Sequence, residues 1–326
     1  MNYVGIDLGG TRLRVAIAGA GGPIQHVVRH PTEADRGPEH VINRIVKTIE
    51  EALRHERIKP AEVASMAIGM PGPANGKTGV VLSPPNLPGW RDVPIASILT
   101  ERTAIPTNLE NDANLAAFGE ARAGAGKGAR NLAYVTVSTG IGAGLVLDGR
   151  LYSGASGVAG EVGHIVIEPG GPLCNCGNRG CLEAIASGTA IARAAREALE
   201  TRARTQLRRH RESDGPTAAE VVRAARGGDA LSRRLLDRAG TALGIGMGTL
   251  VNLLNPELLI LGGSVMKAGG LINRPMQTSL KVSSWESARR GLRIVAPRLG
   301  QNAGLVGAVE WARLQATSAA RVQATR

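Results

Sequence analysis

Aromatic residues are scarce in this chain of 326 residues, which has three tryptophans, three tyrosines and one phenylalanine. Hydrophobic residues still make up 43% of the chain, so its core must be built mostly from Leu, Ile, Val and Ala. This composition, with charges of both signs, is typical of a globular protein and excludes a disordered one. At this length the chain can bury a large core, and we expect two domains.

A long hydrophobic run is also missing. The longest uncharged stretch, residues 239–256, contains four glycines and two asparagines. It therefore predicts a buried helix followed by a strand, and no membrane partner. The first residues have no basic flank and are interrupted by Asp7, so we predict no secretion signal and a cytoplasmic location.

Acidic residues are too few to balance the basic ones. There are 39 Lys and Arg against 27 Asp and Glu, which gives a net charge of +12, and arginine is dense from Arg193 to Arg238. Such a surface can attract nucleotides, polyphosphate or nucleic acid. The alternative, which we favour, is a solvated arginine-rich helical surface without a specific role. No aromatic residues are interleaved for base stacking, so we predict no nucleic-acid partner.

Cysteine is rare, and the three cysteines of the chain lie within eight positions of one another. They are Cys174, Cys176 and Cys181, and His164 precedes them by ten residues. Three thiolates and one imidazole form a tetrahedral Cys₃His zinc site without an open position, so we expect a structural Zn²⁺. The odd number of cysteines argues against full disulfide pairing. Three inert buried cysteines are the alternative, and the tight clustering disfavours it.

Two glycine-rich turns lie about half a chain apart, Asp7-Leu-Gly-Gly-Thr11 and Ser138-Thr-Gly-Ile-Gly-Ala-Gly144. Each separates two short apolar runs, which predicts a strand–turn–strand unit at both places. Such turns expose N–H groups that can hold phosphate oxygens, and the first begins with an acid suited to Mg²⁺ or a metal-bound water. The second turn does not match the dinucleotide pattern, and Gly126-Lys127 does not match the Walker A pattern. One such turn alone would more often be an ordinary hairpin.

A candidate catalytic acid stands in the segment Glu110-Asn-Asp-Ala-Asn114. It places Asp112 after a short apolar strand and at the start of a predicted helix. Phosphoryl transfer to a sugar hydroxyl needs a base near that hydroxyl, and a neighbouring amide can orient the sugar. The alternative is that Asn111 or Asp112 only caps the helix, and these residues by themselves favour the cap.

Hydrophobic periodicity predicts further elements that frame these motifs. We expect helices near residues 38–57, 114–123 and 304–315, and helices through most of residues 184–253 with a charged loop at 205–216. A strand at residues 63–68 runs into a turn, and a buried strand at 258–261 runs into Gly262.

From Val4 to about Trp311, the chain resembles the ROK family (repressors, open reading frames, kinases) of the actin-like ATPase superfamily. Within this family it is most similar to the bacterial glucokinases. Both glycine turns, the Glu110–Asn114 segment, Gly69-Met-Pro-Gly72 and Asn86-Leu-Pro-Gly-Trp90 carry the resemblance. The most specific part is Glu161-Val-Gly-His164 followed by Cys174-Asn-Cys-Gly-Asn-Arg-Gly-Cys-Leu-Glu183. One departure is Arg12, where many relatives have Lys.

The resemblance implies a role for each matching residue. Asp112 would be the catalytic base for the sugar 6-hydroxyl, and His164 would bind zinc with one ring nitrogen and sugar with the other. The residues implied to contact the sugar are Gly72, Asn86, Asn111, Asp112, Glu161, His164 and Glu183. Those implied to hold ATP and Mg²⁺ are Asp7, Gly9, Gly10, Thr11, Thr139, Gly140, Gly262, Gly263 and Ser264.

The implied fold is α/β, with two actin-like (ribonuclease H-like) ATPase domains and a cleft between them for ATP and the sugar. The sequence places residues 1–115 and 304–316 in the smaller domain, 116–303 in the larger one, and 317–326 in a flexible tail. Because relatives are often oligomers, we expect a homodimer or homotetramer.

Several alternatives stay open at this point. The hexose could be N-acetylglucosamine, N-acetylmannosamine, mannose or fructose in place of glucose, and polyphosphate could replace ATP as donor. The family also contains sugar-responsive repressors with a helix-turn-helix ahead of the first glycine turn. Only six residues precede Asp7 here, so we expect an enzyme.

Overall fold

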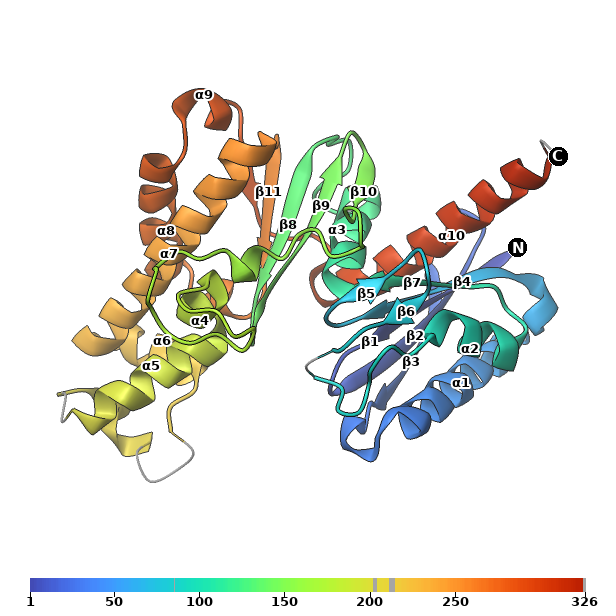
Figure 1. Ribbon diagram of the computed structural model, residues 1–326, viewed down its shortest axis with the longest axis horizontal. Helices are drawn as coiled ribbons and strands as arrows, with labels where there is room; N and C mark the ends of the chain where they lie inside the picture. The colour runs from blue at the N-terminus through green and yellow to red at the C-terminus, as the bar shows by residue number, and fades with distance from the viewer. Residues whose placement is uncertain (85, 202–203, 211–214, 325–326) are drawn as a thin grey trace. The chain divides into compact units, whose positions relative to one another are not determined.

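The computed structural model describes residues 1–84, 86–201, 204–210 and 215–324 (Figure 1). They form two compact units. The first contains residues 1–130, 144–159 and those from 297 onward, and the second contains residues 131–143 and 160–296.

The first unit is built on a five-stranded sheet in the order β3-β2-β1-β4-β7. Strands β1 (Asn2–Leu8), β2 (Arg12–Gly19) and β3 (Ile24–Pro31) are joined by antiparallel pairing. Strands β4 (Val63–Met70) and β7 (Thr107–Asn111) extend the sheet by parallel pairing. The parallel strands therefore end at the same edge, where the first glycine turn also lies. A short hairpin, β5 (Ala74–Asn75) and β6 (Val80–Val81), follows β4.

Helices cover both faces of this sheet. On one face, alternate residues of β1 such as Val4 and Ile6 share a buried cluster with α1 (Pro38–His55) and α2 (Ile95–Thr103). On the other face, alanines of β2 and β4 pack against α10 (Ala303–Ala324), beside α3 (Asp112–Ala123). The small side chains on this second face let α10 lie close to the strands.

The second unit contains most of another five-stranded sheet, with the order β10-β9-β8-β11-β12. Its strands are β8 (Leu132–Val137), β9 (Ile141–Leu147), β10 (Arg150–Tyr152), β11 (Leu258–Gly262) and β12 (Arg293–Val295). The division between the two units passes through β9. Strand β11 pairs in parallel with β8 and β12, and β9 pairs antiparallel with β10. The strand order thus repeats that of the first sheet.

The helices of the second unit are α4 (Leu182–Ala186), α5 (Gly188–Glu200), α6 (Ala218–Arg226), α7 (Ala230–Leu254), α8 (Gly270–Ser283) and α9 (Glu286–Arg289). Helices α7 and α8 pack tightly against each other because Gly240, Gly244 and Gly248 recur every fourth residue along α7. A Cβ on Gly240 would lie 2.5 Å from Cγ of Pro275, and one on Gly248 would lie 2.9 Å from Cβ of Ser283.

Most of the elements expected from the sequence are present. The uncharged stretch at 239–256 is the second half of α7, and the buried strand β11 follows it. Helix α3 begins at Asp112, two residues earlier than expected, because Asn111 caps it. Helix α10 runs to Ala324, so residues 317–324, which the sequence assigned to a flexible tail, are helical. Among the described residues, no helix is long and apolar enough to span a membrane.

Residues 116–130, 144–159 and 297–303, which the sequence assigned to the larger domain, belong to the first unit. Buried Glu120 of α3 connects the first and the last of these segments. Its carboxylate accepts hydrogen bonds from the backbone of Ala125, of Arg298 (3.1 Å) and of Leu299 (2.8 Å), and so ties α3 to the segment that enters α10.

Candidate functional site

The first glycine turn is held from two sides. The Gly9 N–H donates to the Arg12 carbonyl at 2.8 Å, and the hydroxyl of buried Thr32 donates to the Gly9 carbonyl at 2.7 Å. A Cβ on Gly10 would lie 3.0 Å from both Cβ and the carbonyl oxygen of Asn86. The close approach of the turn to Asn86 therefore brings a predicted phosphate-binding residue and a predicted sugar-binding residue together in one unit.

Asp7 stands at the end of β1, opposite Arg14 of β2. Arg14 donates to Asp7 Oδ2 through both Nε (2.8 Å) and Nη2, and its Nη1 donates to the Gln301 carbonyl at 2.7 Å. Both side chains are less than one-fifth exposed. The arginine therefore fixes the orientation of a carboxylate predicted to face Mg²⁺. Arg14 is not among the residues predicted from the sequence, although its position opposite Asp7 in a hairpin was a usable signal.

Asn111 and Asp112 occupy the junction between β7 and α3. The Asn111 side chain is the N-cap of α3 and accepts hydrogen bonds from the N–H groups of Ala113 (2.9 Å) and Asn114 (3.1 Å). Its amide nitrogen donates to the Gly72 carbonyl at 3.0 Å. Asn111 thus caps α3, and the same side chain connects Gly72 to the helix start that carries Asp112.

Glu110 lies directly before this pair and is buried. Its Oε1 accepts from the Asn111 N–H (2.9 Å) and from Nδ2 of Asn114 (2.8 Å), and its Oε2 accepts from the Ser153 hydroxyl (3.3 Å). Burial raises the pKa of Glu110, although these hydrogen bonds oppose the shift. No role was predicted for Glu110 from the sequence, although it stands in a quoted motif. Its hydrogen bonds to Asn111 and Asn114 hold the start of α3 in place.

The second glycine turn follows β8 in the second unit. There the Ser138 hydroxyl is 3.1 Å from the Ser264 hydroxyl, which joins the turn to the Gly262–Ser264 segment at the end of β11. Since β8 and β11 are parallel neighbours, their carboxyl ends meet at one edge of the sheet. The five residues predicted to contact the nucleotide in this unit therefore lie at or just after the ends of two adjacent strands: Thr139, Gly140, Gly262, Gly263 and Ser264.

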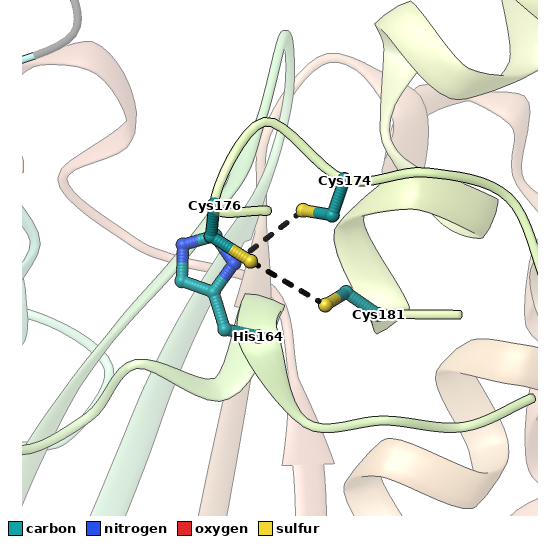
Figure 2. A group of neighbouring side chains, drawn as sticks. All are labelled: His164, Cys174, Cys176 and Cys181. Atoms are coloured by element: carbon teal, nitrogen blue, oxygen red, sulfur yellow. Dashed lines mark hydrogen bonds between the residues drawn. The ribbon is translucent and has the colours of Figure 1, made fainter. Parts of the chain in front are cut away.

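His164, Cys174, Cys176 and Cys181 converge, as Figure 2 shows, and one potential ligand atom of each lies within 4.8 Å of the others. Cys174 Sγ is 3.6 Å from Nδ1 of His164, and Cys176 Sγ is 3.7 Å from Cys181 Sγ. With Zn–S bonds of about 2.3 Å and a Zn–N bond of about 2.0 Å, a tetrahedron has S–S edges of about 3.8 Å and S–N edges of about 3.5 Å. The donor atoms and their spacing fit Zn²⁺.

The second ring nitrogen of His164 points to a different neighbour. Its Nε2 lies 3.7 Å from Oε2 of Glu161. Burial raises the pKa of Glu161, as does the nearby Glu183 carboxylate, while His164 opposes the shift. Three residues predicted to bind the sugar, Glu161, His164 and Glu183, are thus neighbours in the second unit.

Among its described residues, the arginine-rich segment 193–238 contains none of the predicted sugar-binding, nucleotide-binding or zinc-binding residues. Arg208 and Arg209 lie in a short 3₁₀ helix, Gln206–His210, whose His210 pairs with Glu220 of α6. Arg202 and Arg211 lie outside the described residues.

A model of the ROK family matches residues 3–315. The glucokinase of Thermotoga maritima is 37% identical over 94% of this chain and 96% of its own length. The glucokinase of Halalkalibacterium halodurans is 36% identical, over 94% and 93%. A xylose repressor of Caldicellulosiruptor bescii is 29% identical over 94% of this chain and 77% of the repressor.

Solved structures of ROK family kinases superimpose on nearly the whole chain. A ROK hexokinase from Thermus thermophilus matches with a TM-score of 0.83 and 36% identity, covering 98% of this chain and 100% of the other. A ROK family glucokinase from Streptomyces griseus, in complex with glucose and AMPPNP, matches with a TM-score of 0.79 and 32% identity, covering 96% and 100%.

Proposed function

Because this chain belongs to the ROK family, we propose that it phosphorylates the 6-hydroxyl of a hexose with ATP, and that glucose is the preferred sugar. The observation that carries the proposal is the Asn111–Asp112 junction. It joins a fixed amide and a carboxylate at a helix start, and it occurs in a chain 36–37% identical to glucokinases.

Asp112 is the proposed catalytic base. It accepts the proton of the 6-hydroxyl as the sugar oxygen attacks the terminal phosphorus of ATP and the bond to ADP breaks. Asn111, Asn86 and Gly72 of the first unit bind sugar hydroxyls in this proposal. Glu161, His164 and Glu183 of the second unit supply the remaining hydrogen bonds to the sugar.

The two glycine turns are the proposed phosphate-binding elements. Asp7 and the N–H groups of Gly9, Gly10 and Thr11 act in the first unit, and Thr139 and Gly140 in the second. Mg²⁺, when bound with ATP, neutralises negative charge on the phosphates. Arg14 donates to Asp7 Oδ2, and Oδ1 is the oxygen that we propose for the cation or its water. Gly262, Gly263 and Ser264 are proposed to border the adenosine.

We propose a structural role for zinc at the Cys₃His cluster. His164, Cys174, Cys176 and Cys181 would hold the ion, which would fix the ring orientation of His164 and leave Nε2 for the sugar. A cytoplasmic location and assembly into a homodimer or homotetramer complete the proposal.

Initial rates on a panel of sugars test this function. Glucose, mannose, fructose, N-acetylglucosamine and N-acetylmannosamine are each offered with Mg²⁺–ATP and then with polyphosphate. The expected result is the highest kcat/KM for glucose with ATP. A higher kcat/KM for another sugar would reassign the substrate, and no phosphorylation of any sugar would contradict the kinase proposal.

A further inference from the structure

Three hydrogen bonds attach the second glycine turn to residues 183–189, which form α4 and the start of α5. The Ile141 N–H donates to Oε2 of Glu183 at 2.7 Å. The Gly188 N–H donates to the Ser138 carbonyl at 2.7 Å, and the Thr189 N–H donates to the Thr139 carbonyl at 3.4 Å. The turn at residues 138–141 is therefore held along its length by the segment 183–189, and Glu183 is the one side chain among these contacts.

The Glu183 carboxylate also lies against the backbone of the turn. A Cβ on Gly140 would lie 2.5 Å from Glu183 Oε2, so glycine at this position leaves the space that the carboxylate fills. A hydrogen bond from a backbone N–H to a charged oxygen is among the stronger ones in proteins. Glu183 lies in the first turn of α4, and its carboxylate also forms a specific hydrogen bond with the glycine turn.

The same segment is connected to the Cys₃His cluster by the chain and by the backbone. Cys181 precedes Glu183 by two residues, and the Leu182 N–H between them donates to the carbonyl of Ile165, the neighbour of His164, at 2.9 Å. The segment that carries Glu183 is thus fixed on one side by the cluster. On its other side it holds the turn.

We propose that Glu183 is a positioning residue for the second phosphate-binding turn, in addition to the sugar contact assigned to it above. Its Oε2 fixes the Ile141 N–H and so holds the Thr139–Gly140 backbone in the conformation that accepts phosphate oxygens. The inference rests on the proposed function, because it assumes that this turn binds nucleotide. In this proposal, the Glu183 side chain binds the sugar and also positions the turn that binds the nucleotide.

The test measures nucleotide binding without sugar, where a residue acting only on the sugar has no effect. The variants are Glu183→Ala and Glu183→Asp, which remove or withdraw Oε2, and Glu183→Gln, which keeps an oxygen acceptor. Glu161→Gln is the matched control, because Glu161 is assigned to the same sugar and has no hydrogen bond to the turn among the described contacts. Calorimetry gives the Kd for Mg²⁺–AMPPNP, and hydrogen exchange gives the protection of the peptide that contains Ile141.

We expect Glu183→Ala and Glu183→Asp to raise the Kd about tenfold, the effect of losing one hydrogen bond to a charged group. Both should also speed exchange at residues 138–144. Glu183→Gln should stay within about threefold of the natural protein because its amide oxygen still accepts the bond, and Glu161→Gln should match the natural protein in both measurements. Circular dichroism and metal content confirm that each variant is folded, and the conservative Asp variant keeps the test available if the Ala variant does not fold.

Unchanged nucleotide affinity and unchanged exchange in folded Glu183→Ala or Glu183→Asp would overturn the inference, and so would equal losses in Glu161→Gln. The exchange measurement needs neither substrate nor turnover. If the natural protein bound no nucleotide and phosphorylated no sugar, the proposed function would fail. Exchange would still decide whether Glu183 orders the turn.

Discussion

At the scale of single residues, Asp112 is the proposed base, and its neighbours fix the backbone around it. Asn111 caps α3 and donates a hydrogen bond to the Gly72 carbonyl, and buried Glu110 accepts a hydrogen bond from the Asn111 N–H. A substitution that changes only the proton-accepting ability of Asp112 should therefore leave its surroundings in place.

We predict that Asp112→Asn strongly lowers kcat while glucose still binds. The amide keeps the shape of the side chain but cannot accept a proton, and loss of a general base typically costs about 10²–10⁴-fold in rate. Steady-state kinetics and calorimetric titration with glucose measure the two effects separately. Near-normal kcat in this variant would remove Asp112 from the role of base.

At the scale of elements, the loop from His164 to Cys181 leaves Val166 and Leu173 exposed, and we expect a bound metal to stabilise it. Burial raises the pKa of Cys181 to about 12 and also raises that of Cys174. Without metal, the thiols of Cys174 and Cys181 therefore hold their protons more tightly, whereas a hydrogen bond with the Asn178 backbone lowers the pKa of Cys176. Zn²⁺ would displace the remaining thiol protons when it binds.

We predict one zinc per chain in the purified protein, and a zinc affinity that weakens as the pH falls. Cys176→Ala should lower both the Tm and the affinity for sugar, because the metal positions His164 and the segment leading to Glu183. Metal analysis, thermal unfolding and sugar titration provide the measurements. A fully active protein with almost no zinc would refute the metal assignment.

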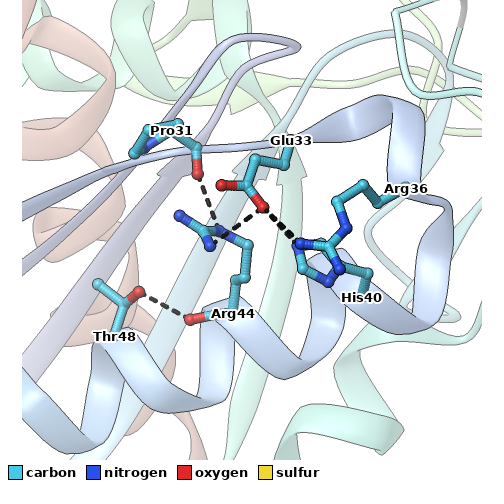
Figure 3. A network of polar contacts seen from close by, with 6 residues as sticks. All are labelled: Pro31, Glu33, Arg36, His40, Arg44 and Thr48. Atoms are coloured by element: carbon cyan, nitrogen blue, oxygen red, sulfur yellow. Dashed lines mark hydrogen bonds and ion pairs between the residues drawn. The ribbon is translucent and has the colours of Figure 1, made fainter.

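A second element-scale feature is the junction of β3 and α1, shown in Figure 3. Glu33 pairs with His40 (2.8 Å), Arg36 (3.3 Å) and Arg44 (3.3 Å), and Nε of Arg44 also donates to the Pro31 carbonyl. The hydrogen bond from His40 lowers the pKa of Glu33 below its ordinary value of 4.5; burial opposes the shift, and the Arg44 charge adds to it. One carboxylate thus joins the strand end to the helix.

We predict that Glu33→Gln lowers the Tm at pH 7 and that the difference from the natural protein disappears in acid. Because folding lowers the pKa of Glu33, its contribution is present above pH 4.5 and is lost as the pH falls below that value. Thermal unfolding from pH 7 to pH 3 measures the trend. Glu39→Gln is a control on a more exposed ion pair of α1, with Arg102. An equal Tm for Glu33→Gln and the natural protein at pH 7 would contradict the prediction.

At the scale of the whole molecule, the net charge of +12 raises the question of whether the basic residues take part in phosphoryl transfer. The variant Arg208→Ala/Arg209→Ala/Arg211→Ala removes three positive charges. We predict that its ATP-dependent rate stays within a few-fold of normal, because exposed charges are screened beyond about 10 Å at 0.1 M salt. Rates with ATP and with polyphosphate at two salt concentrations are the measurement. Loss of ATP-dependent activity in a folded variant would place the basic segment in the active site.

The sequence was most informative where the pattern is local. The periodicity of α1 and the apolar run of β11 predicted elements that the structure contains, and the three cysteines cluster with His164. It was least informative where partners are distant in the chain. The bond from Ile141 to Glu183 spans 42 positions, and that from Glu120 to Leu299 spans 179. No local pattern predicts such pairs, because they depend on how separate elements pack.

The glycines that face α8 from α7 limit which mutations in their codons the protein can tolerate. Each glycine costs a helix about 1 kcal/mol relative to alanine, yet at Gly240, Gly244 and Gly248 even a methyl group would collide with α8. In the genetic code, every change in the first or second base of a glycine codon introduces a larger side chain or a stop. Only third-base changes can be neutral, so an unselected mutant library should lose function at these three codons more often than at exposed positions of the same helix.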